Sequence, residues 1–153
     1  MISLCMIVKN EEENIEKCLL SVEKYVDEIV IVDTGSSDDT KKIAQKYTDK
    51  IYDYKWCGDF SKARDFSISK SSNDWILVLD ADEYISDYSI KNINNFISNN
   101  KNEKTVGRIE RVNITESKAQ EKKYTERIER FFNKKYFKYE GIIHEQIVPV
   151  NKF

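Results

Sequence analysis

The chain has 153 residues, of which 40% are apolar and 34% charged, as expected for one soluble globular domain with a hydrophobic core. Its 25 basic and 27 acidic residues give a formal net charge of −2 without a block of one sign, so nothing supports a nucleic-acid partner. The apolar start at Ile2–Val8 lacks the flanks of a signal peptide, and no apolar run is long enough to span a membrane. We therefore expect a cytoplasmic protein without a transmembrane segment, with peripheral membrane association left open.

The first half of the chain alternates strand and helix signals, which predicts an α/β fold with a mostly parallel central sheet flanked by helices. Strands are expected at Ile2–Val8, Glu28–Asp33, near Lys50–Tyr54, and at Trp75–Asp80. The second should be central, because its β-branched run suits a strand covered on both faces. Four helices are predicted from an apolar period of 3.6 residues or from polar capping residues at their start. The first has Ile15, Cys18, Leu19 and Val22 on its inner face, and the last is spaced by Ile90, Ile93 and Ile97. Between them, one helix runs from Asp38 to about Tyr47 and one from Phe60 to about Ser71.

The second half has a different character, in which β-branched, aromatic and charged residues partly alternate. Thr105–Thr115 and Lys122–Asn133 are expected to form antiparallel strands with one wet face. Three cysteines, an odd number without CxxC spacing, cannot all pair with one another. Cys5 and Cys18 are predicted to lie in the core, and Cys57 in a loop.

Polar residues follow three of the predicted parallel strands, where ligands bind in open α/β sheets. The segments are Lys9-Asn10-Glu11, Asp33-Thr34-Gly35 and Asp80-Ala81-Asp82-Glu83. In an extended segment the first and third residues point the same way, so Asp80 and Asp82 could share one Mg²⁺ or Mn²⁺. The alternative is that both carboxylates cap the loop and helix that follow.

Three further residues have both a functional and a structural interpretation. Asp33 either shapes a turn or accepts hydrogen bonds from a nucleobase. Arg64 is either a surface charge or a ligand for diphosphate oxygens, which a guanidinium matches well. His144, the only histidine, is either structural or an additional metal ligand, with the adjacent Glu145 acting as a base toward the acceptor.

Four blocks of sequence in this order resemble glycosyltransferase family 2, a large family of inverting enzymes with the GT-A fold. They are Met6–Glu12, Ile31–Thr40, Asp59–Arg64 and Trp75–Glu83. Gly141-Ile142-Ile143-His144-Glu145 further resembles the branch that holds bacterial lipopolysaccharide-core glucosyltransferases. The resemblance implies one GT-A domain over residues 1–153, with a nucleotide-sugar-binding half at 1–99 and an acceptor-side half at 100–153. Many family members extend well past this length, which leaves open that the second half is truncated.

By this resemblance, the protein transfers a hexose, typically from a UDP-sugar, to a glycan, lipid or protein acceptor, as in the synthesis of bacterial cell-surface glycans. The resemblance implies that the nucleotide-sugar is bound by Ile7, Val8, Lys9, Glu11, Asp33, Arg64, Asp80 and Ala81. It implies that a Mn²⁺ or Mg²⁺ ion is bound by Asp80 and Asp82, and His144 stays a candidate for a further metal ligand. It also implies a carboxylate base, for which Glu145 is the candidate and Glu83 the fallback. Lys9 stands where many relatives have an aromatic ring, and Asp65 where asparagine often follows the arginine, so the nucleotide preference stays open.

Three other classes of protein share some of these features. A dinucleotide-dependent oxidoreductase needs a glycine-rich turn after the first strand, and Lys9-Asn10-Glu11 contains no glycine. A phosphatase with an aspartyl nucleophile would carry its DxD motif on the first strand and follow it with threonine, whereas Glu83 follows here on a later strand. The alternative that stays open is a GT-A-like module that binds a nucleotide-sugar without catalysis.

Overall fold

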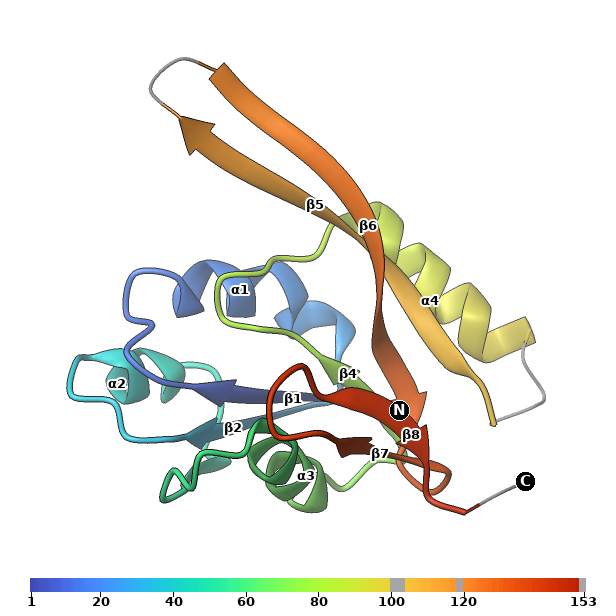
Figure 1. The fold of residues 1–153 in the computed structure, drawn as a ribbon, viewed down its shortest axis with the longest axis horizontal. Helices are drawn as coiled ribbons and strands as arrows, with labels where there is room; N and C mark the ends of the chain where they lie inside the picture. The colour runs from blue at the N-terminus through green and yellow to red at the C-terminus, as the bar shows by residue number, and fades with distance from the viewer. Residues whose placement is uncertain (100–103, 118–119, 152–153) are drawn as a thin grey trace.

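A six-stranded sheet and a separate two-stranded sheet organise the computed structural model, which describes residues 1–99, 104–117 and 120–151. The large sheet has the order β3-β2-β1-β4-β6-β5, and the small sheet is a hairpin of β7 and β8 (Figure 1). The strands are β1 (Ile2–Val8), β2 (Glu28–Asp33), β3 (Ile51–Asp53), β4 (Trp75–Val78), β5 (Val106–Ser117), β6 (Gln120–Asn133), β7 (Phe137–Glu140) and β8 (Gln146–Pro149).

The parallel part of the sheet consists of β1 to β4, as the sequence predicts. β1 pairs in parallel with β2 on one side and with β4 on the other, and β2 pairs in parallel with β3. Val30, Ile31 and Val32 are completely buried, so β2 is covered on both faces as expected. The strand β2 was also expected to be central. It has a neighbouring strand on each side, but the two middle positions of the sheet are occupied by β1 and β4.

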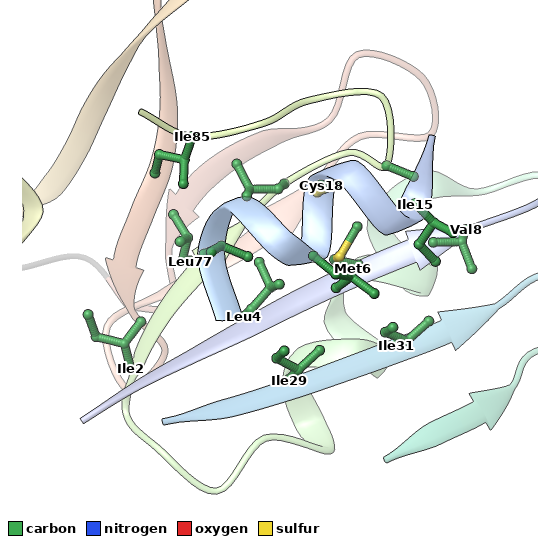
Figure 2. Packing of buried hydrophobic residues seen from close by; sticks show 14 of the residues in the cluster. Ile2, Leu4, Met6, Val8, Ile15, Cys18, Ile29, Ile31, Leu77 and Ile85 are labelled. Carbon is green, nitrogen blue, oxygen red and sulfur yellow. The ribbon is translucent and has the colours of Figure 1, made fainter. Parts of the chain in front are cut away.

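Helices cover both faces of the sheet. They are α1 (Ile15–Val22), followed by the short 3₁₀ turn η1 (Glu23–Tyr25), α2 (Thr40–Ala44), α3 (Phe60–Ser69) and α4 (Asp87–Asn99). The larger core cluster joins alternate residues of β1 to the buried face of α1, and Figure 2 shows Leu4 and Met6 beneath Ile15 and Cys18. The second cluster joins the opposite face of the sheet to Ile68 of α3. The core therefore lies in two layers, one on each side of the sheet.

Several predicted elements are longer than the observed ones, most clearly the second helix and the fourth strand. The second helix was expected to reach Tyr47 but ends at Ala44, after which the amide of Tyr47 donates to the carbonyl of Ala44 in a tighter turn. The strand expected to reach Asp80 ends at Val78. Beyond it the amide of Glu83 donates to the carbonyl of Asp80 at 3.0 Å, so these acidic residues lie in a turn.

The predicted antiparallel strands are confirmed and extend further than expected. β5 and β6 form a long hairpin that projects beyond the rest of the sheet (Figure 1), and the inner end of β6 pairs antiparallel with β4. Phe131 of β6 stacks on Trp75 with ring centroids 5.0 Å apart, and the adjacent Phe132 points into the cluster on the other face. This alternation attaches the hairpin to both layers of the core.

The β7–β8 hairpin was not predicted, although Phe137 and Tyr139 are buried and alternate with exposed residues. The hairpin packs on α3, where the carboxylate of Asp65 accepts a hydrogen bond from the amide of Tyr139 at 2.9 Å. The amide of Phe60 also donates to the carbonyl of Ile142 at 3.1 Å. These contacts place the connection between β7 and β8 beside the start of α3.

The cysteines lie where the sequence places them. Cys5 and Cys18 are buried free thiols, and burial raises the pKa of each to about 12. Such thiols stay protonated and unreactive near neutral pH. Cys57 is free and exposed.

Within residues 1–99, 104–117 and 120–151, no helix is long and apolar enough to cross a membrane.

Candidate functional site at the strand ends

The carboxyl ends of β2, β1 and β4 lie side by side, because these three strands are parallel neighbours. Val8 at the end of β1 is opposite Asp33 at the end of β2, and the amide of Thr34 donates to the carbonyl of Val8 at 2.9 Å. The chain leaves β1 toward β2 on one side and returns to β4 on the other. Such a switch in strand order is where open α/β sheets bind ligands.

Asp33 offers an unused acceptor at this edge. Its side-chain Oδ1 accepts hydrogen bonds from the amides of Gly35 at 2.9 Å and Ser36 at 2.8 Å, in a turn that the positive φ of Gly35 permits. Its Oδ2 is buried and has no partner, and the residue is only 2% exposed. A buried carboxylate oxygen without a partner is costly, so a ligand donor at this position would be favourable.

The segment after β1 is fastened to the segment after β2. The amide of Asn10, which has a positive φ of 54°, donates to the hydroxyl of Ser36 at 2.9 Å. The amide of Glu11 donates to the hydroxyl of Thr40 at 2.7 Å. Of the other predicted residues here, Val8 is buried, Ile7 is half-buried and Lys9 is exposed. The structure thus brings the predicted nucleoside-binding residues of β1 next to Asp33.

Arg64 is a buried side chain, in contrast to the surface charge that was the alternative. The guanidinium donates from Nη2 to Asp80 Oδ1 at 2.7 Å and from Nε to Glu145 Oε1 at 2.6 Å, and only 6% of the residue is exposed. Burial favours the neutral form, but Asp80, Tyr139 and Glu145 outweigh it and raise the pKa of Arg64. The position is fixed by α3, whose first turn is capped by Asp59.

Arg130 of β6 completes this charged cluster. Its Nη2 lies 2.7 Å from Asp80 Oδ2 and 2.8 Å from Glu83 Oε1, so both oxygens of Asp80 are held by arginines. Burial would raise the pKa of Asp80, but Arg64 and Arg130 hold it below its usual range. Glu83 is equally engaged, because its Oε2 accepts the amide of Asp80 at 3.0 Å and Arg111 contacts its Oε1 at 3.2 Å.

The predicted metal ligands differ in their surroundings. The two oxygens of Asp80 are paired, whereas Asp82 is exposed and makes no ion pair with the arginines and lysines that the structure describes. Ala81 between them is buried in the core. His144 is exposed on the β7–β8 connection, with a positive φ of 58°. In the described ranges no three His, Cys, Asp or Glu side chains gather as a metal cage.

This arrangement suits a cation that is coordinated mainly by the phosphates of a bound substrate and by water, with few protein side chains. Mg²⁺ commonly uses only one or two carboxylates and completes its coordination with substrate phosphates and water. Asp82 can supply such a carboxylate without breaking an ion pair. The extended geometry that the sequence argument assumed for Asp80 and Asp82 is absent, because the strand ends at Val78.

The sequence profile described as glycosyl transferase family 2 matches residues 3–149, which is nearly the whole chain. The chain belongs to this family. The α/β fold of the GT-A type that the resemblance implied is therefore confirmed.

Curated relatives of this family 2 chain align with a little over half of it. It is 50% identical over 82 residues to a TPR repeat-containing protein of Synechococcus elongatus, covering 54% of this chain and 20% of that protein. It is 41% identical over 85 residues to an uncharacterized glycosyltransferase of Rickettsia felis, which covers 56% of this chain and 30% of that protein. Over 83 residues it is 41% identical to the prophage-derived glycosyltransferase SunS of Bacillus subtilis, which covers 53% of this chain and 20% of SunS. The chain thus spans less than a third of the length of these relatives.

Solved structures give the same family context. The S. aureus protein TarS, crystallised as residues 1–349 with UDP, superposes with a TM-score of 0.55 at 27% identity. Its complex with UDP-GlcNAc gives a TM-score of 0.56 at 26% identity. The two superpositions cover 64% of this chain and 32% and 31% of the respective TarS chains.

Two residues of this family 2 site, Arg130 and Tyr139, were not predicted from the sequence. Arg130 precedes the apolar pair Phe131-Phe132 and is far from the strand-end motifs in sequence. The signal that could have identified it is a charged side chain beside the buried end of a strand, where an ionic partner is required. Tyr139 lies under the guanidinium of Arg64, 5.5 Å from its Cζ to the ring centroid.

Proposed function

We propose that this family 2 domain binds a UDP-sugar across the ends of β1, β2 and β4 and transfers the hexose, with inversion, to a hydroxyl group of a glycan, lipid or protein acceptor. The observation that carries the proposal is the buried Asp33 Oδ2 without a partner at the point where strand order reverses. A uracil N–H is a suitable donor for that oxygen. TarS, which was solved with UDP and with UDP-GlcNAc and shares this fold, supports the choice of nucleotide.

The charged residues at the end of β4, two strands along the sheet from Asp33, suit the remainder of such a donor. Arg64 keeps one buried nitrogen, Nη1, without a partner, and a guanidinium donor suits a diphosphate oxygen. We assign a Mg²⁺ or Mn²⁺ ion, brought in with the diphosphate, to Asp82, with His144 as a further candidate ligand. Such an ion would stabilise the negative charge that develops on the leaving diphosphate.

Glu145 is a better candidate for the catalytic base than Glu83. Both oxygens of Glu83 accept hydrogen bonds from Asp80, Arg111 or Arg130. Glu145 uses Oε1 to accept from Arg64. Its Oε2 has no partner among the described contacts and can take the proton of an acceptor hydroxyl.

Replacing Asp33 by alanine should weaken both uridine and UDP by about 10- to 100-fold, because a hydrogen bond to a charged acceptor is lost. Isothermal titration calorimetry with each ligand measures the effect. Asp53→Ala is a matched control, since Asp53 ends the adjacent strand β3 but is exposed and pairs with Lys41. A loss confined to UDP, with uridine binding intact, would move Asp33 to another part of the site.

Replacing Asp82 by asparagine should reduce the gain in UDP affinity that Mn²⁺ provides by at least about tenfold, because the cation loses a carboxylate ligand. Calorimetry of UDP with and without Mn²⁺ measures this gain, and uridine affinity should stay the same. Because Asp82 is exposed, the melting temperature of the Asp82→Asn variant is expected to match that of the wild type. An unchanged Mn²⁺ effect would show that the metal assignment is wrong.

The proposed transfer is tested by following UDP release from UDP-glucose and UDP-GlcNAc in the presence of Mn²⁺. Release of UDP supports the proposed glycosyltransferase activity. UDP binding without release favours the alternative of a non-catalytic nucleotide-sugar-binding module. Failure to bind UDP at all would overturn both.

A further inference from the structure

A small cavity lies between β6 and the β7–β8 hairpin, next to the charged cluster. Its volume is about 200 Å³, and its lining includes Ile128, Arg130, Tyr139, Glu145 and Ile147. This is below the roughly 300–1,000 Å³ of cavities that hold drug-sized ligands, so it fits a unit about as large as one sugar ring. Two aliphatic and five polar or charged residues therefore surround a space of limited size.

Two hydrogen-bond donors in the lining have no partner. They are the Nε of Arg130 and the hydroxyl of Tyr139, and both atoms are buried. Tyr139 as a whole is 5% exposed, and the side chain of Arg130 is 11% exposed. Leaving a buried donor without a partner is destabilising, which indicates that another group completes this site.

One acceptor in the lining is also unused. Glu145 accepts from Arg64 through Oε1, while Oε2 has no partner among the described contacts. The cavity is close to the proposed donor site, because Arg64 bridges Glu145 and Asp80 and Arg130 also contacts Asp80. A ligand here would lie one side chain away from Asp80.

We propose that this cavity binds a neutral sugar ring of the acceptor and holds its hydroxyl for attack. The inference rests on the proposed glycosyl transfer and adds the acceptor subsite, with Tyr139 and Arg130 as residues that position the hydroxyl. A sugar hydroxyl accepts from Tyr139 or Arg130 while it donates to Glu145. The aliphatic side chains of Ile128 and Ile147 suit the apolar face of a sugar ring.

The charge of the lining favours a neutral ligand over an anion. The basic residues Arg127 and Arg130 are balanced by the acidic residues Glu129 and Glu145. A phosphate group would place its charge beside two carboxylates. The hydroxyl groups of a sugar ring both donate and accept hydrogen bonds, which matches the unpaired donors and the unpaired carboxylate oxygen at this site.

In the reaction, the acceptor oxygen forms a bond to the anomeric carbon of the donor sugar as its proton passes to Glu145. The bond from that carbon to the diphosphate oxygen breaks, and its electron pair leaves with UDP. No oxidant or reductant is needed. Tyr139 and Arg130 stay protonated and hold the oxygen in place.

A larger hollow of about 480 Å³, also lined by Arg130, is the competing location for the acceptor. Its lining includes Asp82, Glu83 and Val112. Of the two candidate bases, this hollow contains only Glu83, whose oxygens are both engaged, and the carboxylate of Asp82 is assigned to the cation. The smaller cavity, which contains Glu145, is therefore favoured.

The test uses the full chain with Mn²⁺, UDP-glucose or UDP-GlcNAc, and the methyl β-glycosides of glucose, galactose and N-acetylglucosamine as acceptor probes. At least one glycoside should accelerate UDP release. Tyr139→Phe should raise the KM for that glycoside about tenfold, the effect of one buried hydrogen bond, and keep the Kd for UDP within about twofold. Because the hydroxyl is buried without a partner, its removal should not lower the melting temperature.

A pair of blocking variants separates the two hollows. Ile147→Trp fills the small cavity and should abolish the acceleration by the glycoside, whereas Val112→Trp narrows the larger hollow and should retain it. Saturation-transfer NMR of the glycosides with UDP-saturated protein gives the same comparison without turnover. Binding that is lost in Ile147→Trp and kept in Val112→Trp is the expected result.

Three results would overturn the acceptor subsite. They are absence of glycoside binding in wild-type protein that binds UDP, an unchanged KM and glycoside affinity in Tyr139→Phe, and loss of glycoside binding in Val112→Trp alone. Failure of the proposed function is recognised separately, because it appears as absence of UDP binding, or of UDP release from both donors, in the wild type.

Discussion

Replacing Arg64 by methionine is expected to lower the free energy of unfolding by about 3–5 kcal/mol, because a buried ionic network loses its central cation. Arg64 holds Asp80 at 2.7 Å and Glu145 at 2.6 Å. Methionine fills similar space but leaves Glu145 without its cation and Asp80 with Arg130 alone. Urea denaturation followed by circular dichroism measures the change.

The matched control is Arg108→Met on the β5–β6 hairpin. Arg108 pairs with Glu129 at the same distance, 2.7 Å, but 64% of its side chain is exposed, so the expected loss is below about 1 kcal/mol. Arg64→Lys retains a charge and provides a folded variant if methionine is not tolerated. A loss for Arg64→Met as small as that of Arg108→Met would show that the network contributes little to stability.

The same network gives an acid dependence with a defined sign. Arg64 and Arg130 hold the pKa of Asp80 below its unfolded value of about 3.9. The stabilisation by ionised Asp80 is therefore complete above that pH and is lost as the pH falls through the lower, folded pKa. Arg64→Met should show a weaker loss of stability over this acidic range than the wild type.

Replacing Glu145 by glutamine is expected to lower kcat for glycosyl transfer by about 10²- to 10⁴-fold, the usual contribution of a general base. Glutamine retains an oxygen that can accept from Arg64 Nε but cannot take a proton from the acceptor. UDP affinity should stay close to the wild-type value. Steady-state UDP release and calorimetry on the same preparation separate the two effects.

Glu140→Gln is the control for this substitution, since Glu140 lies on the same hairpin with 68% of its side chain exposed. Its activity should match the wild type. If Glu145→Gln transferred at the wild-type rate while Glu83→Gln did not, the base would be Glu83. Loss of folding in Glu145→Gln would favour a structural role for the His144-Glu145 pair.

The local sequence determined the parallel half of the fold and the residues at its edge. Periods of two and of 3.6 residues, with β-branched strands and short turns, predicted the bounds of β1 and β2, the buried face of α1 and the start of α3. Because parallel neighbours end at the same edge, the motifs containing Asp33 and Asp80 were expected to lie together. Short-range patterns suffice here because each strand or helix has its own period and end signals, whichever neighbour it packs against.

Only the tertiary structure revealed the partners of these residues. Arg130 is 50 positions from Asp80, and Glu145 is 81 positions from Arg64. These contacts depend on the register of β6 against β4 and on the packing of the β7–β8 hairpin on α3. No local period encodes such a register, and strands of four residues give too short an alternation to predict. The sequence thus located the edge of the sheet, while long-range packing decided that Asp80 is held by two arginines and that Glu145 lines a cavity.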